Sequence, residues 1–149
     1  LKIPSNMGIA GKPGASLKGW KYFAPNAEVI GADIDRKVLF SENGIRTFYL
    51  NQLDRRSFSS LLEAMTDGVD LVIIDGLHTL RADLNSLLEI LPYLNNNGIL
   101  FIEDVGNLSS KFVWPRLLKL LRHNYSWKIH HNLRGNLVQI SNRRKQNSK

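Results

Sequence analysis

The sequence contains no cysteine, and this absence alone excludes several classes of protein. Disulfide-bonded scaffolds, zinc sites with thiolate ligands and enzymes with a cysteine nucleophile all require that residue. No apolar run approaches the roughly 20 residues that span a bilayer. The first residues show no basic segment followed by a hydrophobic one, so no export signal is expected. We therefore expect a soluble, cytoplasmic protein.

Acidic side chains are absent after Asp104. Residues 1–104 carry 10 Lys and Arg against all 13 acids, a net charge of −3, whereas residues 105–149 carry 10 basic residues and no acid, a net charge of +10. This asymmetry fits either an anionic partner, nucleic acid included, or a solvated surface with a polar tail. Basic and aromatic residues do not alternate as they do in nucleic-acid stacking platforms, so the second interpretation is favoured.

What is present is the composition of an ordinary globular protein, with 149 residues of which 43% are hydrophobic. Short β-branched runs alternate with segments of helical periodicity. The first expected strand, near 3–8, is poorly formed, and the second to fifth expected strands are 28–32, 46–50, 69–74 and 98–102. The expected helices are 17–23, 58–65, 80–94 and 110–123. This alternation predicts an α/β fold whose mostly parallel sheet is covered by helices on both faces.

The end of the chain shows a different pattern. Two strand-like runs, 125–131 and 136–140, are joined by a short link around Arg134-Gly135, which predicts an antiparallel hairpin. No second domain or linker is visible. We expect one domain over residues 1–142, followed by a basic polar tail over 143–149.

The first candidate ligand site combines a glycine loop with an acidic strand end. Gly8, Gly11 and Gly14 precede the first helix, and glycines at such spacing let the backbone approach a ligand closely. Asp33 and Asp35 end the next strand, about 20 residues beyond the loop, where a carboxylate can accept hydrogen bonds from a ribose diol. Together these features favour nucleoside binding over a structural turn and two surface acids, and one of the two acids is expected to cap the following helix.

Polar residues also follow the third expected strand. Gln52 could hydrogen-bond an adenine edge, and Asp54 is equally well placed to cap the next helix.

The fourth and fifth expected strands end in Asp75-Gly76-Leu77-His78 and in Glu103-Asp104. Adjacent strands lie about 5 Å apart, so these carboxylates are expected to converge. Clustered carboxylates repel one another unless a cation lies between them, and Mg²⁺ prefers oxygen ligands. His78 is placed to act as a general base. The alternative is that Asp75 and Asp104 only cap the following helices and that His78 is a loop residue without a function.

Four segments of the sequence form a combined pattern, namely 14–20, 23–35, 73–79 and 98–104. Together they resemble the class I S-adenosylmethionine-dependent methyltransferases, which have a Rossmann-like fold. The resemblance is greatest to the subgroup of macrocin- and mycinamicin-type sugar O-methyltransferases and cephalosporin hydroxylase-like proteins. The Asp-x-x-His sequence with Glu-Asp after the next strand is the most specific part of this resemblance.

The resemblance implies a role for each candidate residue. It implies that the glycine loop passes under the methionine part of S-adenosylmethionine and that Asp33 holds the ribose. The implied cofactor-binding set is Gly8, Gly11, Gly14, Ser16, Asp33, Gln52 and Asp75. The implied Mg²⁺ ligands are Asp75, Glu103 and Asp104, and His78 is implied to deprotonate the acceptor hydroxyl.

The leading hypothesis is therefore a Mg²⁺-dependent O-methyltransferase acting on a hydroxyl of a sugar or small glycosylated metabolite. Assembly into a homo-oligomer is compatible with this hypothesis. One alternative is a non-catalytic binding protein of the same fold, because Asn6-Met7-Gly8 stands where the family has an acidic residue before its first glycine. A nucleic-acid methyltransferase ranks below both, and a nicotinamide dehydrogenase leaves the Asp-x-x-His and Glu-Asp grouping unexplained.

Overall fold

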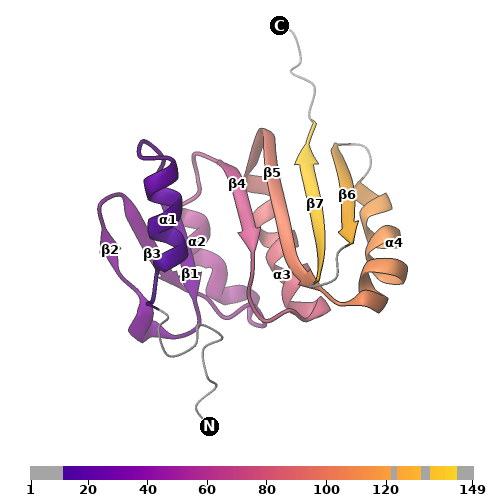
Figure 1. Cartoon of the computed structure of the whole chain (residues 1–149), viewed down its shortest axis with the longest axis horizontal. Coiled ribbons are helices and arrows are strands. Elements are labelled where there is room, and N and C mark those ends of the chain that lie inside the picture. The colour runs from indigo at the N-terminus through magenta and orange to yellow at the C-terminus, as the bar shows by residue number, and fades with distance from the viewer. Residues whose placement is uncertain (1–11, 122–123, 132–134, 144–149) are drawn as a thin grey trace, which may run out of the picture. The chain divides into compact units, whose positions relative to one another are not determined.

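The computed structural model describes residues 12–121, 124–131 and 135–143 (Figure 1). The chain divides into two compact units, one up to Asn51 and one from Gln52 onward. Within the described residues each unit holds its own sheet. The first expected strand, near 3–8, lies outside the described residues together with Gly8 and Gly11. The single domain over 1–142 stays a prediction.

The unit up to Asn51 contains one helix and three strands, α1 (Ala15–Phe23), β1 (Val29–Asp33), β2 (Ser41–Glu42) and β3 (Ile45–Tyr49). β3 pairs in parallel with β1 and antiparallel with β2. α1 approaches β1 closely because Gly31 carries no side chain, and a Cβ there would lie 2.5 Å from Leu17. The expected helix over 17–23 and the expected strands over 28–32 and 46–50 are confirmed, and β2 is an addition.

The unit from Gln52 onward contains a four-stranded sheet in the order β4-β5-β7-β6. Its strands are β4 (Val69–Ile74), β5 (Leu94–Val105), β6 (Tyr125–His131) and β7 (Asn136–Asn142). β4 and β5 are parallel, whereas β7 runs against both β5 and β6. The expected hairpin is confirmed. The expectation of a mostly parallel sheet is wrong for the described residues, because β2 and the hairpin strands make both sheets mixed.

The helices of this unit are shorter than their periodicity predicts. They are α2 (Ser59–Glu63) after a 3₁₀ turn at Arg55–Phe58, α3 (Leu80–Ile90) before a 3₁₀ turn at Leu91–Tyr93, and α4 (Trp114–Leu118) between a π turn at Ser109–Val113 and a 3₁₀ turn at Lys119–Leu121. Pro92 and Pro115 have no N–H to continue an α-helical ladder, which accounts for the breaks near them. Among the described residues, no helix combines the length and apolar character that a membrane span requires.

The core of this unit lies on one face of its sheet. Leu100 and Ile102 of β5 and Val138 and Ile140 of β7 are fully buried. α3 packs against β5 (Figure 1), and Trp114 of α4 is also fully buried. On the opposite face Leu71 and Ile73 of β4 are 45% and 37% exposed. The expectation that this strand is covered on both faces is therefore not met.

Candidate functional site

Asp75 follows the last residue of β4 and opens the loop that leads to α3. The residue that caps α3 is Thr79, whose side-chain oxygen accepts a hydrogen bond from the Ala82 amide at 3.4 Å. Asp75 therefore does not cap the helix, and its side chain is 59% exposed. Its carboxylate remains available to a ligand.

Glu103 and Asp104 lie at the end of β5, beside the end of β4. Ile74 of β4 pairs with Ile102 of β5, so the residues that come next in the chain, Asp75 and Glu103, lie at the same edge of the sheet. The pairing of β5 with β7 shifts register between Ile102 and Val105, and Asp104 has a positive φ of 50°. Such a bulge redirects side chains that strict alternation would send to opposite faces.

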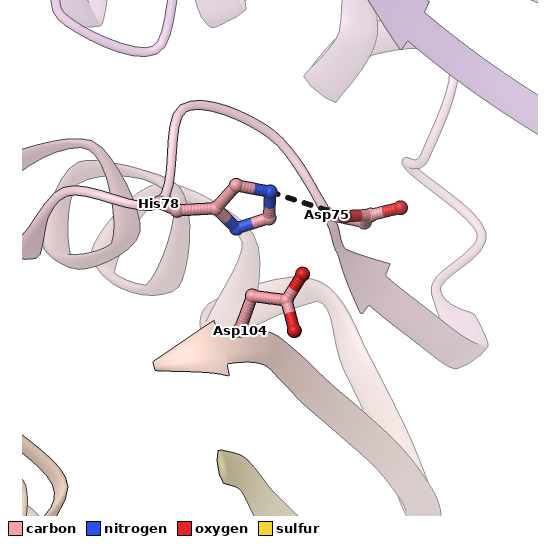
Figure 2. A group of neighbouring side chains, drawn as sticks. All are labelled: Asp75, His78 and Asp104. Atoms are coloured by element: carbon pink, nitrogen blue, oxygen red, sulfur yellow. Dashed lines mark ion pairs between the residues drawn. The ribbon is translucent and has the colours of Figure 1, made fainter. Parts of the chain in front are cut away.

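Asp75, His78 and Asp104 come together at this edge, as Figure 2 shows. Each offers one ligand atom, and these atoms all lie within 4.8 Å of one another. His78 Nε2 lies 3.4 Å from Asp75 Oδ1. His78 has a φ of 51°, a left-handed conformation that costs roughly 1–3 kcal/mol outside glycine and recurs at functional sites.

Glu103 is electrostatically coupled to the same three side chains. Burial raises the pKa of the Glu103 carboxyl group, the charges of Asp75 and Asp104 raise it further, and His78 lowers it. Glu103 is not one of the three residues whose ligand atoms lie within 4.8 Å of one another. The structure thus brings two of the three expected metal ligands together with His78, and it places the third within range of their charges.

This cluster fits a divalent cation. Carboxylates held this close repel one another, and a cation between them removes the repulsion. His78 Nδ1 is buried and has no hydrogen-bond partner among the described residues, so the imidazole lacks the second contact that usually fixes its orientation. Oxygen donors from Asp75, Asp104 and Glu103 suit Mg²⁺, and the imidazole would stand beside it.

Gln52 lies at the start of the same unit, where its amide contacts the loop after β4. Gln52 Oε1 accepts a hydrogen bond from the Leu77 backbone N–H at 2.8 Å, and Gln52 Nε2 donates one to Ser86 Oγ of α3 at 2.9 Å. The expected contact between Gln52 and adenine stays a prediction. Asp54 caps the next 3₁₀ turn by accepting the Arg56 amide, as expected.

Three described residues of the expected cofactor site, Gly14, Ser16 and Asp33, lie in the unit up to Asn51, whereas Gln52 and Asp75 of that set belong to the unit from Gln52 onward. Asp33 ends β1 and is exposed, and its Oδ1 accepts the Asp35 amide at 2.8 Å. Asp35 caps the 3₁₀ turn Arg36–Val38. This confirms the expectation that one of the two acids is a cap, and the ligand role of the other stays a prediction. Gly14 adopts a φ of 75° just before α1, and Ser16 is exposed in its first turn.

Two residues beside the cluster were not anticipated from the sequence. Asp83 of α3 is only 3% exposed; burial raises its pKa to about 6, and the charge of His78 opposes that rise. Gly135 precedes β7, and a Cβ there would lie 2.5 Å from Asp104 Oδ1. A signal for Asp83 was available, because it stands three residues after Leu80 and next to Leu84 on the apolar stripe of the helix.

Comparison with known proteins identifies relatives of this chain. The 8-demethyl-8-alpha-L-rhamnosyl tetracenomycin-C 2'-O-methyltransferase of Streptomyces olivaceus is 32% identical over 92 residues, which are 62% of this chain and 24% of that protein. The mycinamicin VI 2''-O-methyltransferase of Micromonospora griseorubida is 33% identical over 102 residues, 68% of this chain and 24% of that protein. This chain therefore spans about a quarter of the length of these relatives.

A solved structure shares the fold. The MycE methyltransferase from the mycinamycin biosynthetic pathway, in complex with Mg and SAH, matches 97% of this chain and 45% of its own length with a TM-score of 0.69 and 21% identity. A family model described as a methyltransferase domain matches residues 19–105, more than half of the sequence. The subgroup resemblance seen in the sequence is confirmed, and the chain belongs to the methyltransferase-domain family.

Proposed function

We propose that this chain is the core of an S-adenosylmethionine-dependent and Mg²⁺-dependent O-methyltransferase. The observation that carries the proposal is the convergence of Asp75, His78 and Asp104 within 4.8 Å at the ends of two parallel strands. Membership of the methyltransferase-domain family supplies the reaction class. In an α/β sheet this edge is where ligands bind.

Asp75, Glu103 and Asp104 would hold the cation. When bound, Mg²⁺ supplies a fixed positive charge that favours ionisation of a nearby hydroxyl group. The raised pKa of the Glu103 carboxyl group supports this assignment, because part of the rise comes from the charges of Asp75 and Asp104, which a cation would offset.

His78 would accept the proton of the acceptor. The hydroxyl proton passes to the imidazole, a new C–O bond forms to the methyl group, and the S–CH₃ bond of S-adenosylmethionine breaks. The products are a methyl ether and S-adenosylhomocysteine, with the proton on His78. Histidine is the side chain that most often acts as a general base in enzymes, which suits His78 to this role.

Asp33 would bind the ribose of S-adenosylmethionine, and the loop through Gly14 and Ser16 would accompany its methionine part. Support comes from the exposed position of Asp33 at the carboxyl end of β1. Gly8 and Gly11 belong to the same proposed loop but lie outside the described residues.

The proposed acceptor is a sugar hydroxyl on a small glycosylated metabolite. Both curated relatives bear names of 2'- or 2''-O-methyltransferases, and these names refer to a rhamnosyl tetracenomycin and to mycinamicin VI. The two named compounds are therefore the first acceptors to test.

The test combines methyl transfer with cofactor binding. We expect the chain to bind S-adenosylhomocysteine in calorimetry and, with Mg²⁺, to transfer a methyl group detectable by mass spectrometry. Asp104→Asn should abolish transfer and retain S-adenosylhomocysteine binding. Asp67→Asn is the matched control, since Asp67 is an exposed acid in the turn before β4, and it should retain full activity.

Two outcomes would contradict the proposal. Absence of S-adenosylhomocysteine binding would remove the methyltransferase assignment. Binding without transfer to either acceptor, at any Mg²⁺ concentration, would favour the non-catalytic binding protein.

A further inference from the structure

The loop between β4 and α3 is contacted by a side chain from a distant part of the sequence. Leu77 stands between Asp75 and His78, and its amide donates to Gln52 Oε1 at 2.8 Å. Gln52 comes from the segment before α2, 25 residues away in sequence. The contact therefore links the middle of the loop to the segment before α2.

Gln52 is itself tied to α3 at two points. Its Nε2 donates to Ser86 Oγ at 2.9 Å, and its backbone carbonyl accepts Asn85 Nδ2 at 2.8 Å. Ser86 is 2% exposed, so this end of the link is in the core. Both the acceptor and the donor of the Gln52 amide are therefore used within the protein.

Gly76 shows how tightly the Gln52 side chain is packed against the loop. A Cβ at Gly76 would lie 2.0 Å from Gln52 Oε1 and 2.7 Å from Gln52 Cδ. No side chain fits at position 76 while Gln52 keeps its place. The pair explains why a glycine follows Asp75.

We propose that Gln52 is a positioning residue, which sets the spacing of Asp75 and His78 by anchoring the loop between them. The inference rests on the proposed function for the role of those two residues. His78 needs such support because its left-handed φ of 51° is a strained conformation that a free loop would relax. Residues that orient ligands in this way commonly alter metal affinity or activity by about 10- to 100-fold when they are changed.

The first experiment replaces Gln52 with an apolar side chain of similar length, Gln52→Met. We expect the Leu77 amide to lose its protection in hydrogen exchange, and the affinity for Mn²⁺, measured by calorimetry without cofactor, to fall by about 10-fold or more. The affinity for S-adenosylhomocysteine should stay near that of the wild type, because this inference assigns the Gln52 amide to Leu77 and Ser86 in place of the adenine contact expected from the sequence.

The second experiment is a double-mutant cycle with Gly76. Gly76→Ala alone should reduce Mn²⁺ affinity, because the new methyl group displaces the Gln52 side chain or the loop. In a Gln52→Ala background the space is free, so Gly76→Ala should cause little further loss. Additive losses would show that the two residues do not act as a pair, and would overturn the proposal.

The matched control is Asn95→Ala. Asn95 Nδ2 donates to Asp70 Oδ1 at 3.0 Å, near the starts of β5 and β4, so this variant also loses an amide hydrogen bond but at the opposite end of the same strands. It should leave Leu77 protection and Mn²⁺ affinity unchanged.

Other results would overturn the inference. A Gln52→Met variant with weakened S-adenosylhomocysteine binding and normal Mn²⁺ binding would assign Gln52 to the cofactor. Unchanged Leu77 protection would show that the anchor is not formed. If the wild type binds no Mn²⁺, the proposed function fails and not the inference about Gln52. Whether Gln52 anchors the loop is then tested by hydrogen exchange of the Leu77 amide and by the midpoint of thermal unfolding of the same Gln52 and Gly76 variants.

Discussion

Asp83 is a buried acid beside the proposed catalytic imidazole. It lies in the first turn of α3 with 3% exposure, and burial raises the pKa of its carboxyl group to about 6, although the charge of His78 opposes the rise. An unfolded aspartate titrates near pH 3.9. Between about pH 4 and pH 6 the folded state therefore binds more protons than the unfolded state, so the free energy of unfolding falls as the pH rises through this window.

We predict that Asp83→Asn stabilises the protein at pH 7.5. The neutral isostere avoids the cost of a buried charge, which a shift from about 4 to about 6 puts at roughly 2–3 kcal/mol. Below about pH 4 both side chains are neutral, so the two proteins should have nearly equal stability. Urea unfolding across pH 3.5–8 measures the difference, and a variant less stable than the wild type at pH 7.5 would contradict the assignment of a buried, unfavourable charge.

At the scale of single residues, the sequence was informative where chemistry and strand ends coincide. The sequence predicted that Asp75, Glu103 and Asp104 converge beside His78, because polar residues at the carboxyl ends of parallel strands meet. The structure groups Asp75, His78 and Asp104, and Glu103 is not in that group. Gly135 could not be predicted in this way, because its relation to Asp104 depends on β7 lying beside the β-bulge. Gln52 was expected to contact adenine, which stays a prediction, and its partners Leu77 and Ser86 could not be predicted because they depend on how the loop folds.

At the scale of elements, local patterns predicted strands better than helices. The bounds of β4 were predicted from a β-branched run, since β-branched side chains suit a pleated strand. The helix expected over 110–123 is instead divided, up to residue 121, into a π turn, the short helix α4 and a 3₁₀ turn. The periodicity of apolar residues could not predict this break, because it contains no information on the backbone hydrogen bond that Pro115 cannot make. The β2–β3 hairpin did have a signal in Asn43-Gly44, whose φ values of 50° and 74° are those that a two-residue turn requires.

The same broken helix provides a test of packing. Trp114 begins α4 and is fully buried, yet its indole N–H has no hydrogen-bond partner among the described residues. We predict that Trp114→Ala lowers the free energy of unfolding by about 3–5 kcal/mol, since it leaves a large cavity. Trp114→Phe should cost much less, because it keeps most of the ring and removes an unsatisfied donor worth about 1–3 kcal/mol.

Chemical denaturation of the two variants measures this difference. Leu120→Ala is the control, since Leu120 is 78% exposed and its change should stay within about 0.5 kcal/mol. Equal losses for Trp114→Phe and Trp114→Ala would show that the indole N–H is satisfied in solution, for example by a buried water.

At the scale of the whole molecule, the alternation of strands and helices predicted an α/β fold, and the resemblance of four segments implied the methyltransferase fold. Neither predicted the mixed sheets. The methyltransferase fold is confirmed by a TM-score of 0.69 to the MycE methyltransferase. β7 lies between β5 and β6, and this position depends on the pairing of strands that are distant in sequence. The expected hairpin is compatible with this order but does not determine it. Division into two compact units likewise depends on contacts between distant residues.

Cation binding gives a prediction at this scale. A ligand that binds only the folded state stabilises it by about 2.7 kcal/mol at a concentration 100 times its dissociation constant. We expect Mg²⁺ to slow amide exchange in the unit from Gln52 onward, which holds the whole acidic cluster. The Asp75→Asn variant should show no such protection, and equal protection in both proteins would place the cation elsewhere.

The central claim is that Asp75, Glu103 and Asp104 bind one divalent cation beside His78. The most direct measurement is an anomalous difference map from crystals of this chain soaked in Mn²⁺, whose anomalous signal reports its position. The account predicts one strong peak in contact with carboxylate oxygens of these three residues. A map with no peak there, or with the peak at other residues, would contradict it.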